Sequence, residues 1–70
     1  MKDLAVIKVQ SDPKYLSVIR TLTVKMGELY GLSDAAIEDI KLGVDEACSN
    51  VIKHAYGGDT HQSILVRYRM

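Results

Sequence analysis

Five residues recur along one predicted helix at a spacing that is suited to holding a ligand. Glu46 and Asn50 are four residues apart, so their side chains are neighbours on one face of an α-helix. Gly43 lies about one turn before Glu46, and Lys53 and His54 lie about one turn after Asn50. One stripe therefore collects an acid, an amide, a base and an imidazole, with a glycine at its head.

The alternative for this stripe is an ordinary solvated face, since polar residues on a surface helix usually just meet water. Two of these residues are unfavourable inside a helix, so a merely solvated face does not explain them. The short amide of Asn50 competes for backbone groups inside a helix. Gly43 costs about 1 kcal/mol relative to alanine in a helix interior, and it leaves room for a ligand beside Glu46.

The helix that carries the stripe is predicted to begin after Ser33, a good N-cap residue, and to end near Tyr56. Asp34 in its first turn suits the helix dipole. The following Gly57-Gly58-Asp59-Thr60 is typical of a loop. An apolar stripe with helical spacing predicts the buried face, and it consists of Ile37, Ile40, Val44, Ala47, Cys48, Val51 and Ala55.

An earlier helix is predicted to start at Pro13, capped by Asp12, and to stop at Gly31. Its buried face is predicted to be Tyr15, Ile19, Leu22, Met26 and Leu29. Its outer face is then Leu16, Arg20, Thr23, Val24 and Gly27. That face carries only one charge, so we interpret Arg20 and Val24 as partner-binding residues. The alternatives are a face that packs on further parts of the domain, or a merely solvated Arg20.

Residues 4–9 and 63–69 are predicted strands, because both are rich in β-branched residues. The order is strand, helix, helix, strand. Two helices on one face of a partly antiparallel sheet make an α+β two-layer sandwich.

Composition favours one small globular unit. The chain has 70 residues, 47% of them hydrophobic, and a formal net charge of zero. A balanced charge gives no support for nucleic-acid binding, and no apolar run approaches the roughly 20 residues of a membrane span. The single Cys48 fits a reducing cytoplasm and is interpreted as a small buried hydrophobe. So short a chain is marginal for an independent core, which predicts an incompletely buried core and either a flexible monomer or a homodimer.

The run Glu46-x-x-x-Asn50-x-x-Lys53-His54-Ala55-Tyr56 resembles the N-box of the GHKL, or Bergerat-fold, ATPases and kinases. The flanking segment 37–45 and the earlier helix resemble the serine-kinase anti-sigma factors of Gram-positive bacteria. The resemblance covers nearly the whole chain and implies the first part of a Bergerat fold. It does not include the family's Asp-x-Gly-x-Gly box or its second glycine-rich box. Residues 1–70 are therefore expected to be the N-terminal part of one such domain, whether a fragment, a truncated reading frame or a piece completed by another chain.

The resemblance implies ATP and Mg²⁺ as cofactors. Asn50 would be a Mg²⁺ ligand, since Mg²⁺ prefers oxygen donors. Glu46 would face the γ-phosphate and act as the general base toward a serine hydroxyl. Lys53 would lie near phosphate and His54 would fix the helix end, although both have the alternative of a solvated or cap-stabilising role.

The implied function is a protein serine/threonine kinase that phosphorylates an anti-sigma-factor antagonist and sequesters a sigma factor. Two alternatives stand beside it. One is another GHKL ATPase or sensor-kinase domain, and the other is a binding fragment without catalysis.

Overall fold

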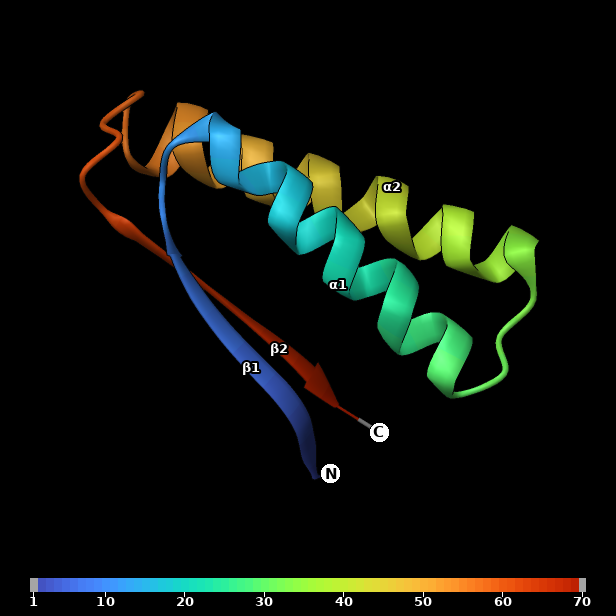
Figure 1. The fold of residues 1–70 in the computed structure, drawn as a ribbon. Coiled ribbons are helices and arrows are strands. Elements are labelled where there is room, and N and C mark those ends of the chain that lie inside the picture. Colours follow the sequence, from blue (N-terminus) through green and yellow to red (C-terminus); the bar gives the residue numbers. More distant parts are fainter. Residues whose placement is uncertain (1, 70) are drawn as a thin grey trace.

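The computed structural model describes residues 2–69 and contains two long helices packed on a pair of strands (Figure 1). A 3₁₀ turn, Pro13–Tyr15, leads into the first helix, and a π-helical segment, Val51–Ala55, extends the second. The main elements in chain order are β1 (Asp3–Gln10), α1 (Leu16–Leu29), α2 (Asp34–Asn50) and β2 (Ser63–Arg69). The predicted α+β class and the order strand, helix, helix, strand are confirmed.

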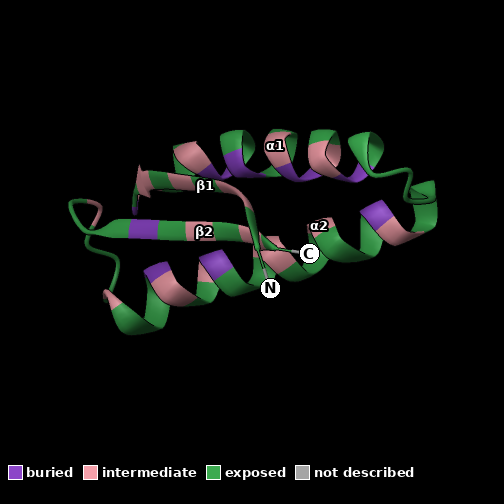
Figure 2. Cartoon of the chain, turned by 90° about the horizontal axis from the view of Figure 1, so that it is seen from below, coloured by how far each residue is buried: buried purple, intermediate pink, exposed green. Residues whose placement is uncertain are grey.

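The two strands are antiparallel neighbours although more than fifty residues separate them along the chain. Val9 lies opposite Ile64, and Ile7 lies opposite Val66. Side chains alternate between the two faces of a strand, so these four point to one face. Both helices cover that same face, and the buried positions of α1 and α2 look toward the strands (Figure 2). Residues 2–69 therefore form a two-layer sandwich, and none of their helices covers the other face of the sheet.

The predicted helix starts are confirmed by their caps. The Asp12 side chain accepts a hydrogen bond from the Lys14 backbone N–H at 3.0 Å, at the head of the 3₁₀ turn. The Ser33 hydroxyl accepts one from the Ala36 N–H at 3.1 Å. Gly31 between the helices has a φ of 71°, the left-handed conformation that glycine adopts at helix ends. These local contacts place α2 antiparallel to α1 through a short turn.

The buried face of α1 differs from the prediction. Leu29 is 77% exposed, whereas three residues assigned to the outer face, Leu16, Thr23 and Gly27, are buried. Hydropathy treats threonine and glycine as surface residues, and here each has a specific reason to be inside. The Thr23 hydroxyl donates to the Ile19 carbonyl at 2.8 Å and lies 2.7 Å from the Tyr68 hydroxyl, so its polarity is satisfied.

Gly27 is buried because the helices approach closely at this point. A Cβ atom at Gly27 would lie 2.6 Å from Cγ1 of Ile37 on α2. Only the absence of a side chain allows that contact. The true inner stripe of α1 is thus turned relative to the predicted one, toward α2 and β2.

The core is small. Ile19 is its most enclosed hydrophobic member, with 1% of its surface exposed. The cluster consists of Leu16, Ile19, Cys48, Ile52 and Ile64. The predicted apolar stripe of α2 is confirmed at Ile37 and Cys48, but Ile40 is 44% exposed because two strands cover only part of that helix.

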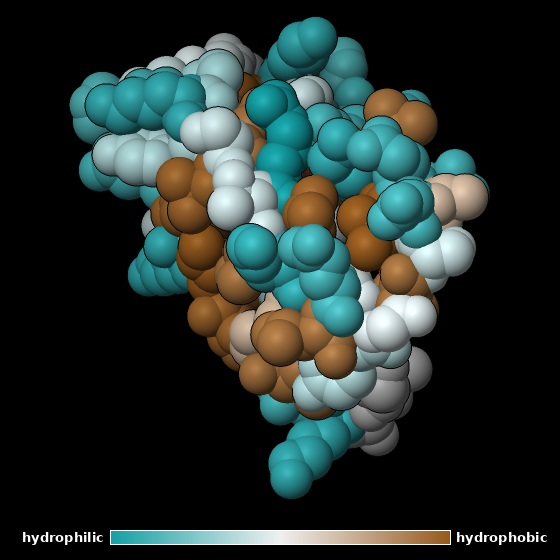
Figure 3. Space-filling view, turned by 45° about the vertical axis from the view of Figure 1, so that its right-hand side comes forward, coloured by the Kyte–Doolittle hydropathy of each residue, from teal (hydrophilic) through white to brown (hydrophobic). Residues whose placement is uncertain are grey.

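The sandwich is open at the end where α1 turns into α2. An apolar hollow of about 290 Å³ lies there between the helices and β2, lined in part by Met26, Ile40 and Val66. Hydrophobic atoms gather on the face shown in Figure 3. The expectation of an incompletely buried core is confirmed. Within residues 2–69, no helix has the length and apolar character that crossing a membrane requires.

Candidate functional site

Glu46 and Asn50 lie one turn apart on α2 and are both exposed. Each is two residues from Cys48, which is buried in the core. Two residues correspond to about 200° around an α-helix, so both side chains leave the helix on the side opposite the core. The structure therefore brings the predicted acid and amide together on a solvent-facing surface.

Gly43 adds open space beside this pair. A Cβ atom built there would meet no atom within 4 Å among the described residues. Nothing in the packing of α2 thus requires a glycine, in contrast to Gly27. Gly43 lowers the stability of the helix by about 1 kcal/mol relative to alanine, and no packing contact of α2 depends on it. A ligand or partner that approaches α2 closely would explain the glycine.

Lys53 and His54 lie in the π-helical segment, and both are exposed. The Tyr56 N–H bonds to the carbonyl of Val51, five residues earlier, at 3.0 Å. The helix does continue to Ala55, as expected, but its last turn is wider than the α-helix that we predicted. The π geometry turns Lys53 and His54 away from the positions that the α-helical wheel gave them. Such segments occur often at functional sites.

The basic side chains Lys53 and His54 also suit a purely structural role. They occupy the last turn, where unpaired carbonyl groups carry partial negative charge. Among the described residues, neither they nor Glu46 and Asn50 form a side-chain hydrogen bond or ion pair that would commit them to the fold. All four are thus available to a ligand, and their predicted roles stay predictions.

A cross-helix ion pair borders the site. The Arg20 Nε atom lies 2.7 Å from Oδ1 and 2.9 Å from Oδ2 of Asp45. Asp45 directly precedes Glu46, and sequence reasoning did not single it out. Periodicity within one helix carries no signal for a pair whose members are 25 residues apart on different helices. Arg20 itself, predicted to bind a partner, is exposed at the edge between α1 and α2.

Cys48 lies in the core and not on the exposed face of α2. It is a free cysteine with 5% of its surface exposed. Burial raises the pKa of its thiol, and the negative charge of Asp45 adds to the effect. A protonated, enclosed thiol is unreactive, which confirms the interpretation as a small buried hydrophobe.

Asn50 is the predicted metal ligand, and it offers a neutral amide oxygen on the exposed face of α2. Within residues 2–69, no group of three or more His, Cys, Asp or Glu side chains is placed to hold a metal ion. Mg²⁺ commonly takes one or two protein oxygens and completes its shell with substrate phosphates and water. The exposed amide oxygen of Asn50 suits that arrangement.

The comparison with protein families decides the class. The model of the histidine kinase-like ATPase domain matches residues 9–70. The chain belongs to this family. The resemblance drawn from Glu46, Asn50 and the residues around them is confirmed, and the observed fold is consistent with a partial histidine kinase-like ATPase fold.

Relatives within the family are similar over nearly the whole chain. The serine-protein kinase RsbW of Bacillus subtilis is 33% identical over 66 residues, which cover 94% of this chain and 41% of the relative. RsbW of Bacillus licheniformis is 35% identical over 66 residues, with the same coverage. RsbW of Listeria innocua is 34% identical over 70 residues, covering all of this chain and 45% of the relative. The chain thus spans less than half the length of these relatives.

Proposed function

We propose that the whole protein is an ATP-dependent serine/threonine protein kinase and that this chain supplies one wall of its nucleotide site. The observation that carries the proposal is that Glu46 and Asn50 lie side by side on the solvent-facing side of α2, next to the open space at Gly43. Membership of the histidine kinase-like ATPase family supports ATP as the cofactor. The relatives named serine-protein kinase support a serine hydroxyl as the acceptor.

In this proposal the roles follow from the order of the residues along α2. Mg²⁺ neutralises charge on the phosphates when it is bound with ATP. Asn50 would hold the metal through its amide oxygen. Glu46, one turn earlier, takes the proton from the attacking serine hydroxyl. Lys53 would lie near the phosphates, and His54 would fix the end of the helix beside them. Only Glu46 takes part in proton transfer.

We further propose that the kinase acts as an anti-sigma factor, with a sigma factor and an antagonist protein as partners. Arg20 and Val24 are assigned to the partner surface. Arg20 is exposed and Val24 is half-buried at the same edge of α1. We keep the expectations of a homodimer and a cytoplasmic location as part of the same proposal, without nucleic acid or membrane as partners.

The test is transfer of radiolabelled phosphate from ATP to a serine-containing antagonist protein by the purified whole protein. Glu46→Gln removes the base and should lower the rate by about 10²–10⁴-fold, with nucleotide binding retained. Asn50→Ala should weaken Mg·ATP binding itself in calorimetry. Glu38→Gln is the matched control, because Glu38 is an exposed acid on the same helix whose carboxylate pairs with Lys41.

Full kinase activity in Glu46→Gln would remove the general-base role. ATP hydrolysis without transfer to protein would favour another ATPase of the family. Absence of nucleotide binding in the whole protein would favour the binding-only alternative. The last two outcomes separate the kinase proposal from its two competitors, and the first tests the role of Glu46 alone.

A further inference from the structure

Tyr56 ends the π-helical segment and connects it to β2. It belongs to the run that resembles the N-box, but the metal and the proton transfer proposed above do not involve it. Its hydroxyl donates a hydrogen bond to the carbonyl of Ser63, the first residue of β2, at 2.6 Å. Its side chain also packs against the core cluster. The tyrosine thus uses its apolar body for packing and its polar tip for one specific contact.

Wide hydrogen-bonded turns close the end of the π-helical segment. The Tyr56 N–H donates to the Val51 carbonyl at 3.0 Å, and the Gly58 N–H donates to the Ile52 carbonyl at 2.8 Å. The first bond spans five residues, one more than a bond of an α-helix. The second closes over Gly57 and Gly58, whose φ values of 57° and 83° are left-handed. Turns of the π type are rare, which indicates that contacts outside the helix hold this one.

Two anchors fix the π-helical segment to the rest of the fold. Ile52, inside the segment, is buried with 5% of its surface exposed. Tyr56, directly after the segment, is bonded to Ser63 across the loop that leads to β2 (Figure 1). Lys53 lies between these anchors and is exposed. The direction of the Lys53 side chain therefore depends on the angle at which the two anchors hold the backbone.

Without the hydroxyl bond, the segment can adopt the regular α-helical pattern. The Val51 carbonyl would then accept from the Ala55 N–H in place of the Tyr56 N–H, because an α-helical bond spans four residues. The turn would lose one residue, and one residue corresponds to about 100° of helix rotation. Lys53, which lies within this turn, would change direction relative to Asn50, which lies before it.

We propose that Tyr56 is a positioning residue for nucleotide binding. Its bond to Ser63 holds the π-helical turn in the orientation that brings Lys53 to the phosphates of ATP. The inference rests on the kinase function proposed above, in which Lys53 lies near the phosphates. Glu46 and Asn50 come before the turn, so proton transfer and the metal contact do not depend on Tyr56.

The experiment uses the whole protein and removes only the hydroxyl group, by Tyr56→Phe. The dissociation constant for Mg·ATP, measured by calorimetry, should rise about 3–10-fold, the range expected for the loss of one hydrogen bond. The rate of phosphate transfer at saturating ATP should stay within about twofold of the parent, because the variant changes binding and not the proton transfer by Glu46. A mere loss of folded protein would lower that rate as well.

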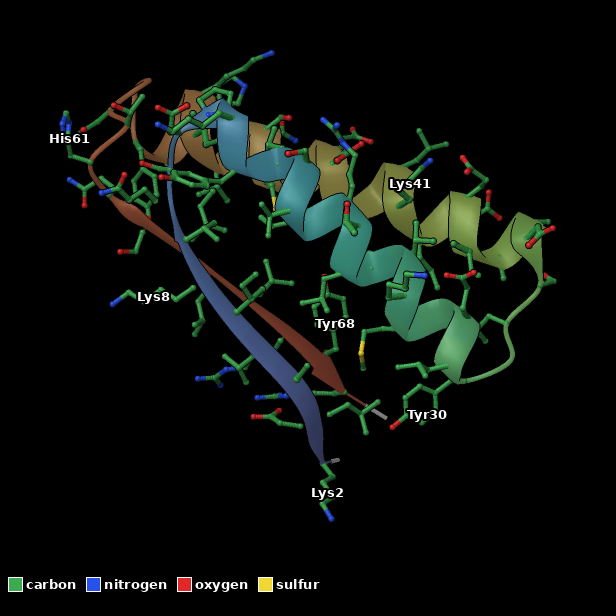
Figure 4. All side chains as sticks on the ribbon, viewed as in Figure 1. Lys2, Lys8, Tyr30, Lys41, His61 and Tyr68 are labelled. Carbon is green, nitrogen blue, oxygen red and sulfur yellow. The ribbon has the colours of Figure 1, made fainter. Side chains whose placement is uncertain are left out.

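Tyr68→Phe is the matched control, since it also removes one tyrosine hydroxyl from β2 or its border. The Tyr68 hydroxyl lies between β2 and α1 (Figure 4), 2.7 Å from the Thr23 hydroxyl and 3.3 Å from the Ile19 carbonyl. It is at the other end of β2 from Ser63. Tyr68→Phe should lower the stability of the fold and leave the dissociation constant for Mg·ATP unchanged.

Lys53→Ala tests whether Tyr56 acts through the lysine. The double variant Tyr56→Phe/Lys53→Ala should bind Mg·ATP no more weakly than Lys53→Ala alone, and additive losses would overturn the proposal. Amide hydrogen exchange reports on the turn itself. Exchange of the Tyr56 and Gly58 N–H groups should speed up more in Tyr56→Phe than in Tyr68→Phe, and the opposite order would count against the anchor.

Unchanged affinity for Mg·ATP in Tyr56→Phe would overturn the positioning role and leave the kinase function standing. An equal loss of affinity in Tyr68→Phe would reduce the effect to general stability and overturn the role too. A whole protein that binds no nucleotide would remove both proposals. Circular dichroism checks that each variant is folded. If Tyr56→Phe is not, Gly58→Ala replaces it, because Gly58 closes the same turn with a left-handed φ, and the same loss of affinity is expected.

Discussion

The same substitution should have opposite effects at the two helical glycines. Alanine at Gly43 meets no atom within 4 Å, so only helix propensity changes. That gain is about 1 kcal/mol. Alanine at Gly27 makes the same gain, but its Cβ would lie 2.6 Å from Cγ1 and 3.0 Å from Cδ1 of Ile37. Cγ1 is close to the backbone and Ile37 is buried, so relief requires the helices to move apart.

Overpacking of this kind costs about 1–3 kcal/mol. Set against the propensity gain, Gly27→Ala should destabilise the fold by up to about 2 kcal/mol. Gly43→Ala should stabilise it by about 1 kcal/mol. For a chain of this size, 1 kcal/mol corresponds to about 4–8 °C in the unfolding temperature, so the two variants should lie on opposite sides of the parent.

Thermal and urea unfolding of the 70-residue chain, followed by circular dichroism, measure both changes. The double variant Gly27→Ala/Ile37→Ala provides the control, because it removes the atom that clashes. The cost of Gly27→Ala should be smaller in that background. Equal stabilisation by both glycine substitutions would refute the close approach of α1 to α2. Destabilisation by Gly43→Ala would refute the open space beside Glu46.

Two further predictions concern buried groups. Ser11 is fully buried, and its hydroxyl donates to the Asp59 carbonyl at 2.6 Å and accepts from the Gln62 N–H at 3.0 Å. Ser11→Ala leaves the Asp59 carbonyl and the Gln62 N–H without this partner and should lower the free energy of unfolding in urea by about 1–3 kcal/mol. Ser17→Ala, at an exposed position, should lower it less. Equal losses would contradict the role of Ser11. The pKa of the Cys48 thiol is raised above its ordinary value of 9.0 in the folded chain. The stability that this shift contributes is fully present below the ordinary pKa and is lost as the pH rises through the folded pKa. Cys48→Ala should therefore lose less stability than the parent when the pH is raised above about 9, and identical pH profiles would refute this.

Much of the architecture was predictable because it is decided locally. The caps at Asp12 and Ser33 and the left-handed turn at Gly31 involve only contacts within a few residues. The strand Ser63–Arg69 follows from its own β-branched and aromatic residues. The pairing of Glu46 with Asn50 is equally local, since helical geometry alone places residues four apart side by side.

The buried face of α1 was not predictable from periodicity. Thr23 is buried because the Tyr68 hydroxyl, which reaches α1 from β2, lies within hydrogen-bonding distance of it (Figure 4). Gly27 is buried because the side chain of Ile37 packs directly against it. Tyr68 and Ile37 lie on other elements, so the sequence of α1 alone does not show which of its faces is buried.

The sequence by itself determined the element order, the caps at Asp12 and Ser33, and the solvent-facing acid and amide of α2. Each depends on interactions between residues close in the chain, for which residue type and spacing are sufficient. Only the tertiary structure decided the inner face of α1, the Arg20–Asp45 pair and the role of Ser11 in holding the loop before β2. These depend on contacts across 10 to 51 residues of chain, and such contacts exist only once α1, α2 and the strands have packed together.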